Sequence, residues 1–151
     1  MARILVIDDE VAIRDSIRLI LEHRGHHVVV AEGGQRGVAA LEAFAFDVVV
    51  VDIFMPGMDG FQTIKSLRQS APKVAIVAIS GYEFREASWP VPDFLKMACA
   101  LGATCCLRKP FKAWELVEAV EASCRALPSE QDAAHRRGVL ASDCTGTFSQ
   151  A

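Results

Sequence analysis

Residues 48–60 read VVVVDIFMPGMDG, in which four consecutive valines run into an aspartate and then into a loop that contains a proline and two glycines. A short, continuous run of β-branched residues is typical of a strand that is covered on both faces in a parallel sheet. The proline and glycines then predict a turn, after which Asp59 can cap a helix over residues 60–69. The stretch therefore predicts one strand–loop–helix unit.

Similar units lie on either side of this one. Further apolar runs occupy residues 4–7, 28–30, 74–79 and 105–107, and helical spacing of apolar residues occupies 11–23, 35–43, 92–101 and 113–127. Five alternating strand–helix units predict an α/β, doubly wound parallel sheet. We expect the flavodoxin-like strand order 2-1-3-4-5.

Length and composition set the organisation of the chain. Its 151 residues suit one domain, which we expect over residues 1–127. Residues 128–151 are rich in Ser, Ala, Gln, Thr and Gly and predict a flexible C-terminal tail. The net charge of −3 and the lack of a long apolar run argue against direct nucleic-acid binding and against a membrane segment. No signal peptide is recognisable after Met1, so we expect a cytoplasmic location.

The cysteine and histidine residues do not suggest a metal site. The five cysteines are Cys99, Cys105, Cys106, Cys124 and Cys144. They lack C-x-x-C spacing and are interpreted as small buried hydrophobic residues. The three neighbouring histidines, His23, His26 and His27, fall at the end of the sheet opposite to the strand-end carboxylates, and we expect them to be structural or solvated.

Polar side chains follow four of the predicted strands. They are Asp8 and Asp9, Asp52, Ser80, and Lys109. Ligands of open α/β sheets bind beyond the carboxyl ends of the strands, so these groups are expected to converge. Crowded carboxylates need a cation, and a site with oxygen ligands alone favours Mg²⁺. A carboxylate, a divalent cation, an ammonium and a hydroxyl together suit phosphoryl transfer onto the carboxylate.

With these motifs in place, the chain resembles the receiver domain of bacterial response regulators. The matching pieces are ILVIDDE at 4–10, VVVVDIFMPGMDG at 48–60, VAIS at 77–80 and LRKPF at 107–111. The resemblance spans residues 3–126 and implies phosphorylation of Asp52. It also implies that a sensor histidine kinase or a phosphotransfer protein supplies the phosphoryl group from a phosphohistidine.

The resemblance further implies a role for each site residue. Asp9 and Asp52 would bind Mg²⁺ through their side chains, the backbone carbonyl of Phe54 would add a ligand, and Asp8 would act through a bound water. Lys109 would contact the phosphoryl oxygens, and Ser80 would move to hydrogen-bond the phosphate. A downstream protein, or a second copy in a homodimer, would bind the face made by residues 92–101, 105–107 and 113–127.

Three departures from the family pattern bear on function. Cys106 stands where the fifth strand usually carries an aromatic residue, and the stretch 81–101 is longer than usual. Phe54 is bulky beside the expected path of the hydrolytic water, so we hypothesise that it slows autodephosphorylation. A binding module that works without phosphorylation stays open as an alternative. A phosphatase with an aspartate nucleophile would need an aspartate at position 54 and is disfavoured.

Overall fold

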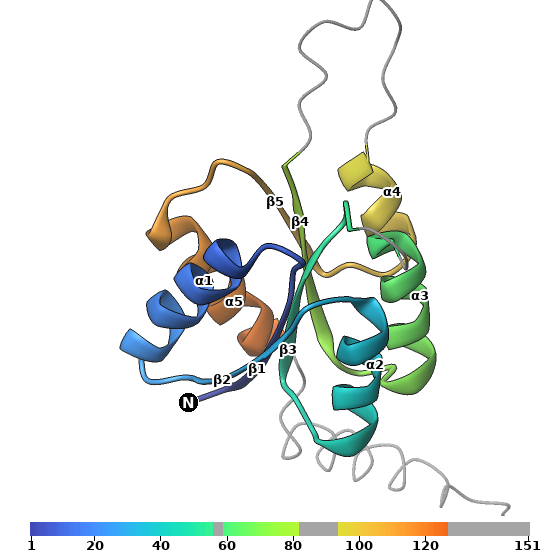
Figure 1. Ribbon diagram of the computed structural model, residues 1–151, viewed down its shortest axis with the longest axis horizontal. Helices are drawn as coiled ribbons and strands as arrows, with labels where there is room; N and C mark the ends of the chain where they lie inside the picture. Colours follow the sequence, from blue (N-terminus) through green and yellow to red (C-terminus); the bar gives the residue numbers. More distant parts are fainter. Residues whose placement is uncertain (56–58, 82–93, 127–151) are drawn as a thin grey trace, which may run out of the picture.

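The protein forms a single five-stranded parallel sheet, described here by a computed structural model for residues 1–55, 59–81 and 94–126 (Figure 1). The strands are β1 (Arg3–Ile7), β2 (His27–Ala31), β3 (Val48–Asp52), β4 (Ala75–Ser80) and β5 (Cys105–Arg108). Their order in the sheet is β2-β1-β3-β4-β5, which confirms the predicted doubly wound order. Every neighbouring pair is parallel.

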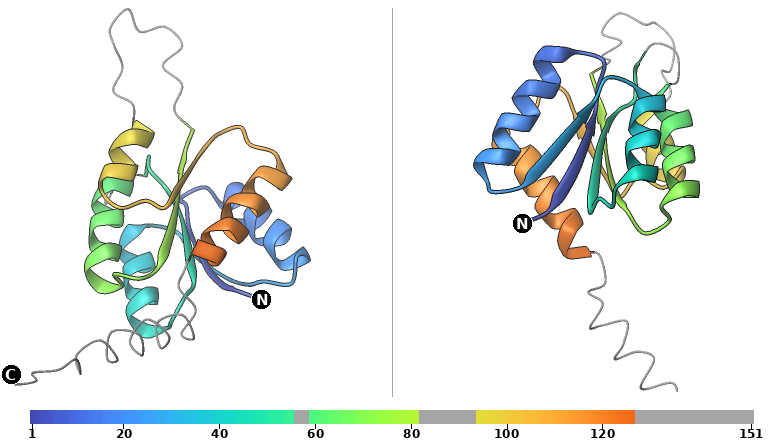
Figure 2. Two further views of the ribbon diagram at one scale, coloured as in Figure 1. Left: turned by 180° about the vertical axis from the view of Figure 1, so that it is seen from behind. Right: turned by 60° about the horizontal axis from the view of Figure 1, so that its bottom comes forward.

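Helices cover both faces of the sheet. They are α1 (Val11–His23), α2 (Gly34–Ala43), α3 (Gly60–Ser70), α4 (Phe94–Ala100) and α5 (Ala113–Ala126). In Figures 1 and 2, α1 and α5 lie on one face, and α2, α3 and α4 lie on the other. Each face therefore has a hydrophobic core of its own.

The central strand β3 shows why the apolar runs lack alternation. All five of its residues are buried. Val49 and Val51 belong to the core beneath α2, α3 and α4, and Val48 and Val50 belong to the core beneath α1 and α5, because successive strand side chains point to opposite faces. Burying one such side chain stabilises the folded state by about 1.5–3 kcal/mol. Because helices cover both faces of the sheet, every valine of the unbroken run adds to this stability.

The predicted element boundaries are close to those observed. Strand β4 begins one residue later than expected, at Ala75, because Val74 still belongs to a turn in which its N–H donates to the Ala71 carbonyl at 3.2 Å. The predicted cap of α3 is confirmed, since the Asp59 carboxylate accepts from the Gln62 N–H at 2.8 Å. Helix α4 ends, as expected, before Gly102, which has a φ of 113°. The predictions that a helix begins near Pro92, that the last helix reaches Leu127 and that a flexible tail follows all concern residues outside the described ranges.

The parallel arrangement brings the carboxyl ends of all the strands to one edge of the sheet. The residues that follow β1, β3, β4 and β5 meet there, and that edge carries the polar groups described below. None of the helices in the described part of the chain is both long enough and apolar enough to span a bilayer.

Candidate functional site

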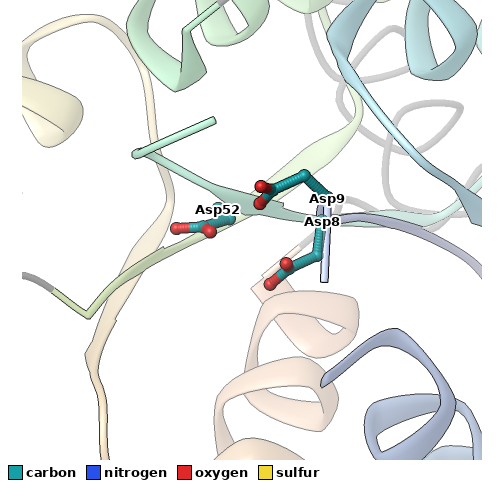
Figure 3. A group of neighbouring side chains, drawn as sticks. All are labelled: Asp8, Asp9 and Asp52. Atoms are coloured by element: carbon teal, nitrogen blue, oxygen red, sulfur yellow. The ribbon is translucent and has the colours of Figure 1, made fainter. Parts of the chain in front are cut away.

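Three aspartates meet at the carboxyl edge of the sheet. Asp8 and Asp9 follow β1, and Asp52 ends the adjacent strand β3. Figure 3 shows the three side chains clustered and projecting to the same side, and one carboxylate oxygen from each lies within 4.8 Å of the others. Asp8 and Asp52 are buried, with 1% and 6% of their surface exposed, whereas Asp9 is exposed. The expected convergence of the carboxylates is therefore found.

Lys109 supplies the positive charge of this cluster. Its Nζ lies 3.2 Å from Asp8 Oδ2 and 3.4 Å from Asp52 Oδ2. The backbone places it there: Lys109 follows β5, and its N–H donates to the Ser80 carbonyl at 2.7 Å. The peptide bond between Lys109 and Pro110 is cis, a feature that sequence patterns did not reveal.

Burial dominates the electrostatics of Asp52. Desolvation raises the pKa of its carboxyl from the ordinary 3.8 to about 6, and the negative charge of Asp8 adds to the rise, while the Lys109 ammonium and the Phe54 N–H oppose it. Burial by itself lowers the pKa of Lys109, but the charges of Asp52 and Asp8 outweigh it and raise that pKa. Lys109 is therefore a fixed cation at neutral pH, and Asp52 is mostly ionised.

Backbone N–H groups hold the two buried carboxylates in place. The Glu10 N–H donates to Asp8 Oδ1 at 2.9 Å, and the Phe54 N–H donates to Asp52 Oδ1 at 3.2 Å. Arg14 adds a bond from its guanidinium to the Asp8 carbonyl at 2.7 Å. Each carboxylate thus has one oxygen fixed by the backbone and the other facing the Lys109 ammonium.

Ser80 lies at the same edge of the sheet. It is the last residue of β4, one position beyond Ile79, which is the strand partner of Asp52. Only 5% of its surface is exposed. The structure therefore brings Ser80 to the strand end beside Asp52, as the sequence predicts.

Two glycines allow the chain to approach this site closely. A Cβ on Gly60 would lie 2.2 Å from Ile53 Cα and 2.5 Å from the Asp52 carbonyl oxygen, so the start of α3 can pack against the end of β3 only without a side chain. A Cβ on Gly81 would lie 2.9 Å from Lys109 Cδ. The role of Gly81 beside Lys109 was missed by sequence reasoning, although a glycine directly after a strand is a signal of close approach.

An open cavity of about 840 Å³ lies over the cluster. Asp9, Asp52 and Lys109 contribute to its polar part, and Phe54 and Phe111 contribute apolar surface. One wall comes from Glu10, the N-cap of α1, which follows Asp9 at the expected strand end, and from α1 itself. The α1 residues on this wall were not foreseen as site residues; they are Ile13, Ser16, Ile17 and Ile20. A small anionic group can therefore reach Asp52 from solvent.

The donor atoms fit a hard divalent cation. Among the residues that the structure describes, Asp8, Asp9 and Asp52 form the one group of three or more metal-ligating side chains, and all their donors are carboxylate oxygens, as Mg²⁺ prefers. The histidines lie elsewhere. The His26 Nδ1 accepts from the Ala2 N–H at 3.2 Å, and its Nε2 lies 3.6 Å from Glu121 Oε1, so the expected structural role of His26 is confirmed.

The chain is similar to a known family and to several known proteins. The pattern of the response regulator receiver domain matches residues 4–121. The transcriptional regulatory protein FixJ of Bradyrhizobium diazoefficiens is 33% identical over 122 residues, which cover 81% of this chain and 56% of FixJ. The protein PilH of Pseudomonas aeruginosa is 43% identical over 79 residues, which cover 52% of this chain and 65% of PilH. The chain thus spans less than two thirds of either relative.

Solved structures give the same result. The chemotaxis protein CheY4 of Vibrio cholerae superposes with a TM-score of 0.71 at 28% identity, covering 82% of this chain and 98% of CheY4. The receiver domain of NtrX from Brucella abortus superposes with a TM-score of 0.73 at 32% identity, covering 82% of this chain and 98% of that domain. Both similarities extend over nearly the whole of the matched structure.

Proposed function

Because the chain belongs to the response regulator receiver domain family of two-component signalling, we propose that its Asp52 carboxylate accepts a phosphoryl group and that this modification is its signal. The family is one of signalling domains rather than of enzymes with a released product. A phosphatase with an aspartate nucleophile would need a second aspartate two residues after Asp52. That position holds Phe54, which contributes an apolar wall to the cavity.

The observation that carries the proposal is the position of Asp52. Its carboxylate is nearly buried, it borders an open cavity, and one of its oxygens lies 3.4 Å from the Lys109 ammonium. An oxygen of Asp52 would attack the phosphorus of a phosphohistidine, so that a P–O bond forms, the P–N bond breaks and the imidazole leaves. The Lys109 charge would neutralise the transferred oxygens, and the Ser80 hydroxyl would donate a hydrogen bond to them.

A divalent cation completes the charge balance. We infer that Mg²⁺ is held by the side chains of Asp9 and Asp52 and by the backbone carbonyl of Phe54, with Asp8 acting through a water. The all-oxygen donor set and the crowding of three carboxylates support this assignment. Bound there, the cation would offset negative charge on the phosphoryl oxygens and on the aspartates.

The ionisation of Asp52 sets a pH requirement. Its pKa of about 6 in the metal-free protein makes the nucleophilic carboxylate the major form at neutral pH. Protonation below that value removes the negative charge that makes the carboxylate oxygen nucleophilic. We therefore expect acceptance to slow as the pH falls below about 6, and bound Mg²⁺ would move this limit to lower pH because a cation favours the ionised form.

The partners are part of the same proposal. A sensor histidine kinase or a phosphotransfer protein would be the donor, and a downstream protein in the cytoplasm would bind the face made by α4, β5 and α5. The same face would serve a homodimer. The phosphoryl group would be lost again by autodephosphorylation. We assign the receiver domain to residues 1–127 and regard residues 128–151 as a C-terminal tail.

Intact mass after incubation with Mg²⁺ and acetyl phosphate tests the proposal. Wild type should gain one phosphoryl group, Asp52→Asn should gain none, and Asp59→Asn should behave as wild type because Asp59 is an exposed helix cap outside the cluster. A wild type that binds Mg²⁺ but gains no mass would contradict the proposal. Equal labelling of Asp52→Asn would also contradict it, because another residue would then be the phosphoryl acceptor.

A further inference from the structure

Two cysteines lie in contact where α4 meets β5. Cys99, near the end of α4, and Cys106, in β5, have their Sγ atoms 2.9 Å apart. That separation is within about 1 Å of the ~2.05 Å length of a disulfide bond. Both are thiols in this structure. A pair this close in space and seven residues apart in sequence can be joined without moving either element far.

The direction of each side chain follows from the strand. Cys106 packs against the core beneath α2, α3 and α4, whereas its neighbour Cys105 packs against the core beneath α1 and α5. Successive residues of a strand point to opposite faces, so only one of the two adjacent thiols can face Cys99. Cys105 is therefore a natural internal control for Cys106.

The connection between the two cysteines is held in place by hydrogen bonds. Arg68 of α3 donates from its Nε to the Gly102 carbonyl at 2.9 Å. The Thr104 N–H donates to the Ile76 carbonyl in β4 at 2.7 Å. These bonds tie the short turn to α3 and β4 on either side of the pair. The two sulfur atoms are thus positioned in advance, which reduces the entropy cost of linking them.

The two thiols differ in access to solvent. Cys99 is exposed, so the buried position expected for it from the sequence is wrong, and Cys106 is only partly buried. Oxidation follows thiol access and thiolate character, and a sensing pair needs an accessible thiol with a second one beside it. Cys99 suits the first role and Cys106 the second. In a reducing compartment such pairs are transient rather than permanent links.

We propose that Cys99 and Cys106 form a reversible disulfide when the protein meets a peroxide, and that the bond ties α4 to β5. The Cys99 thiol gives up its proton and the thiolate attacks one peroxide oxygen, so that an S–O bond forms and the O–O bond breaks. The departing hydroxide takes up that proton and leaves as water. The Cys106 thiol likewise loses its proton, and its thiolate attacks the sulfenic sulfur, so that the S–S bond forms and the S–O bond breaks. The hydroxide that leaves takes up this proton to give a second water. Two thiols are oxidised, and the peroxide is reduced to water.

This site is independent of phosphoryl acceptance at Asp52, although it lies on the face that the proposed function uses for output. A dithiol reverses the bond by thiol–disulfide exchange. The protein would thereby carry a second, redox input on α4 and β5.

Mass spectrometry of the full chain after treatment with hydrogen peroxide tests the proposal, without a phosphodonor. Trypsin cleavage at Lys96 and Arg108 places Cys99, Cys105 and Cys106 in one peptide, so variants are needed to assign the bond. Wild type, Asp52→Asn and Cys105→Ser should lose the mass of two hydrogens in peptide 97–108 and recover it with dithiothreitol. Cys99→Ser and Cys106→Ser should not.

The other outcomes overturn the proposal. A bond that is lost in Cys105→Ser, a bond to Cys144, a link between two chains, or oxidation of Cys99 to sulfinic acid without a disulfide would each do so. Loss of the bond in Asp52→Asn would show that it depends on the phosphorylation site.

Hydrogen exchange of the α4 amides tests whether the disulfide restrains this helix. The amides of α4 should exchange more slowly in the oxidised protein than in the reduced protein, and Cys106→Ser treated with peroxide should match the reduced form. A disulfide that forms but leaves α4 exchange unchanged would refute the claim that it restrains the helix.

Discussion

Replacing Asp52 with asparagine should stabilise the metal-free protein at pH 8. The Asp52 carboxylate is buried beside Asp8, and one lysine, Lys109, lies against both. At neutral pH the ionised Asp52 carboxylate is buried, and the loss of its hydration lowers the stability of the folded protein. The charge is needed for the proposed function but not for folding. Asparagine keeps nearly the same shape and removes the charge.

The magnitude follows from the pKa of Asp52. A rise from 3.8 to about 6 on folding corresponds to a destabilisation of about 3 kcal/mol once the carboxyl is fully ionised. The native state holds the proton more tightly than the unfolded chain, so the stability tied to this proton is fully present below pH 3.8 and is lost as the pH rises through about 6. This value already includes the attraction of Lys109. Because asparagine is itself a polar group at a buried position, we expect a net gain of about 1–3 kcal/mol at pH 8.

Urea unfolding in the presence of a chelator measures this difference. The gain of Asp52→Asn over wild type should be largest at pH 8 and should shrink toward zero near pH 4. Asp59→Asn is the matched control, because asparagine also caps helices well and the site is exposed. The reasoning would be refuted if Asp52→Asn were no more stable than wild type at pH 8. It would also be refuted if the gain in unfolding free energy were the same at pH 8 and pH 4.

Three further substitutions probe the same edge of the sheet. Lys109→Met should slow phosphorylation by acetyl phosphate on the order of 100-fold, because it removes the charge beside the transferred oxygens; a mass time course with Mg²⁺ binding as control would show this, and an unchanged rate would refute it. Phe54→Asn should shorten the phosphoryl lifetime several-fold by opening the cavity wall to water; an unchanged decay of the phosphorylated mass would contradict the hypothesis. Gly60→Ala should lower the unfolding free energy by about 1–3 kcal/mol, because its Cβ would meet the backbone of Ile53; Gly33→Ala, which has open space, should change stability little in the same urea titration, and equal losses in the two variants would contradict the steric argument.

Much of the fold was predictable because its signals are local. The valine run of β3 predicts a strand covered on both faces, and the aspartate cap of α3 predicts where that helix begins. The handedness of strand–helix–strand connections then restricts the order of the strands. The strand ends were predictable for the same reason, which is why Asp8, Asp52 and Lys109 could be expected at one edge.

Other features depended on contacts between distant segments. Nothing near Gly81 in the sequence says that Lys109 passes over it, and the wall of α1 over the cavity follows from how that helix packs. The contact of Cys99 with Cys106 depends on the rotation of α4 about its axis. Hydrophobic periodicity indicates which face of a helix is buried, but it does not indicate which atom on a neighbouring strand that face meets.

The sequence by itself therefore determined the element order, the sheet topology and the identity of the acidic cluster, since these depend on periodicity and on connection rules. Only the tertiary structure decided the burial of Asp52, the two contacts of Lys109 and the pairing of the thiols. The physical reason is distance along the chain. Lys109 is 57 residues from Asp52 and 101 from Asp8, and the strength of a charge interaction depends on separations and desolvation that exist only after the chain has folded.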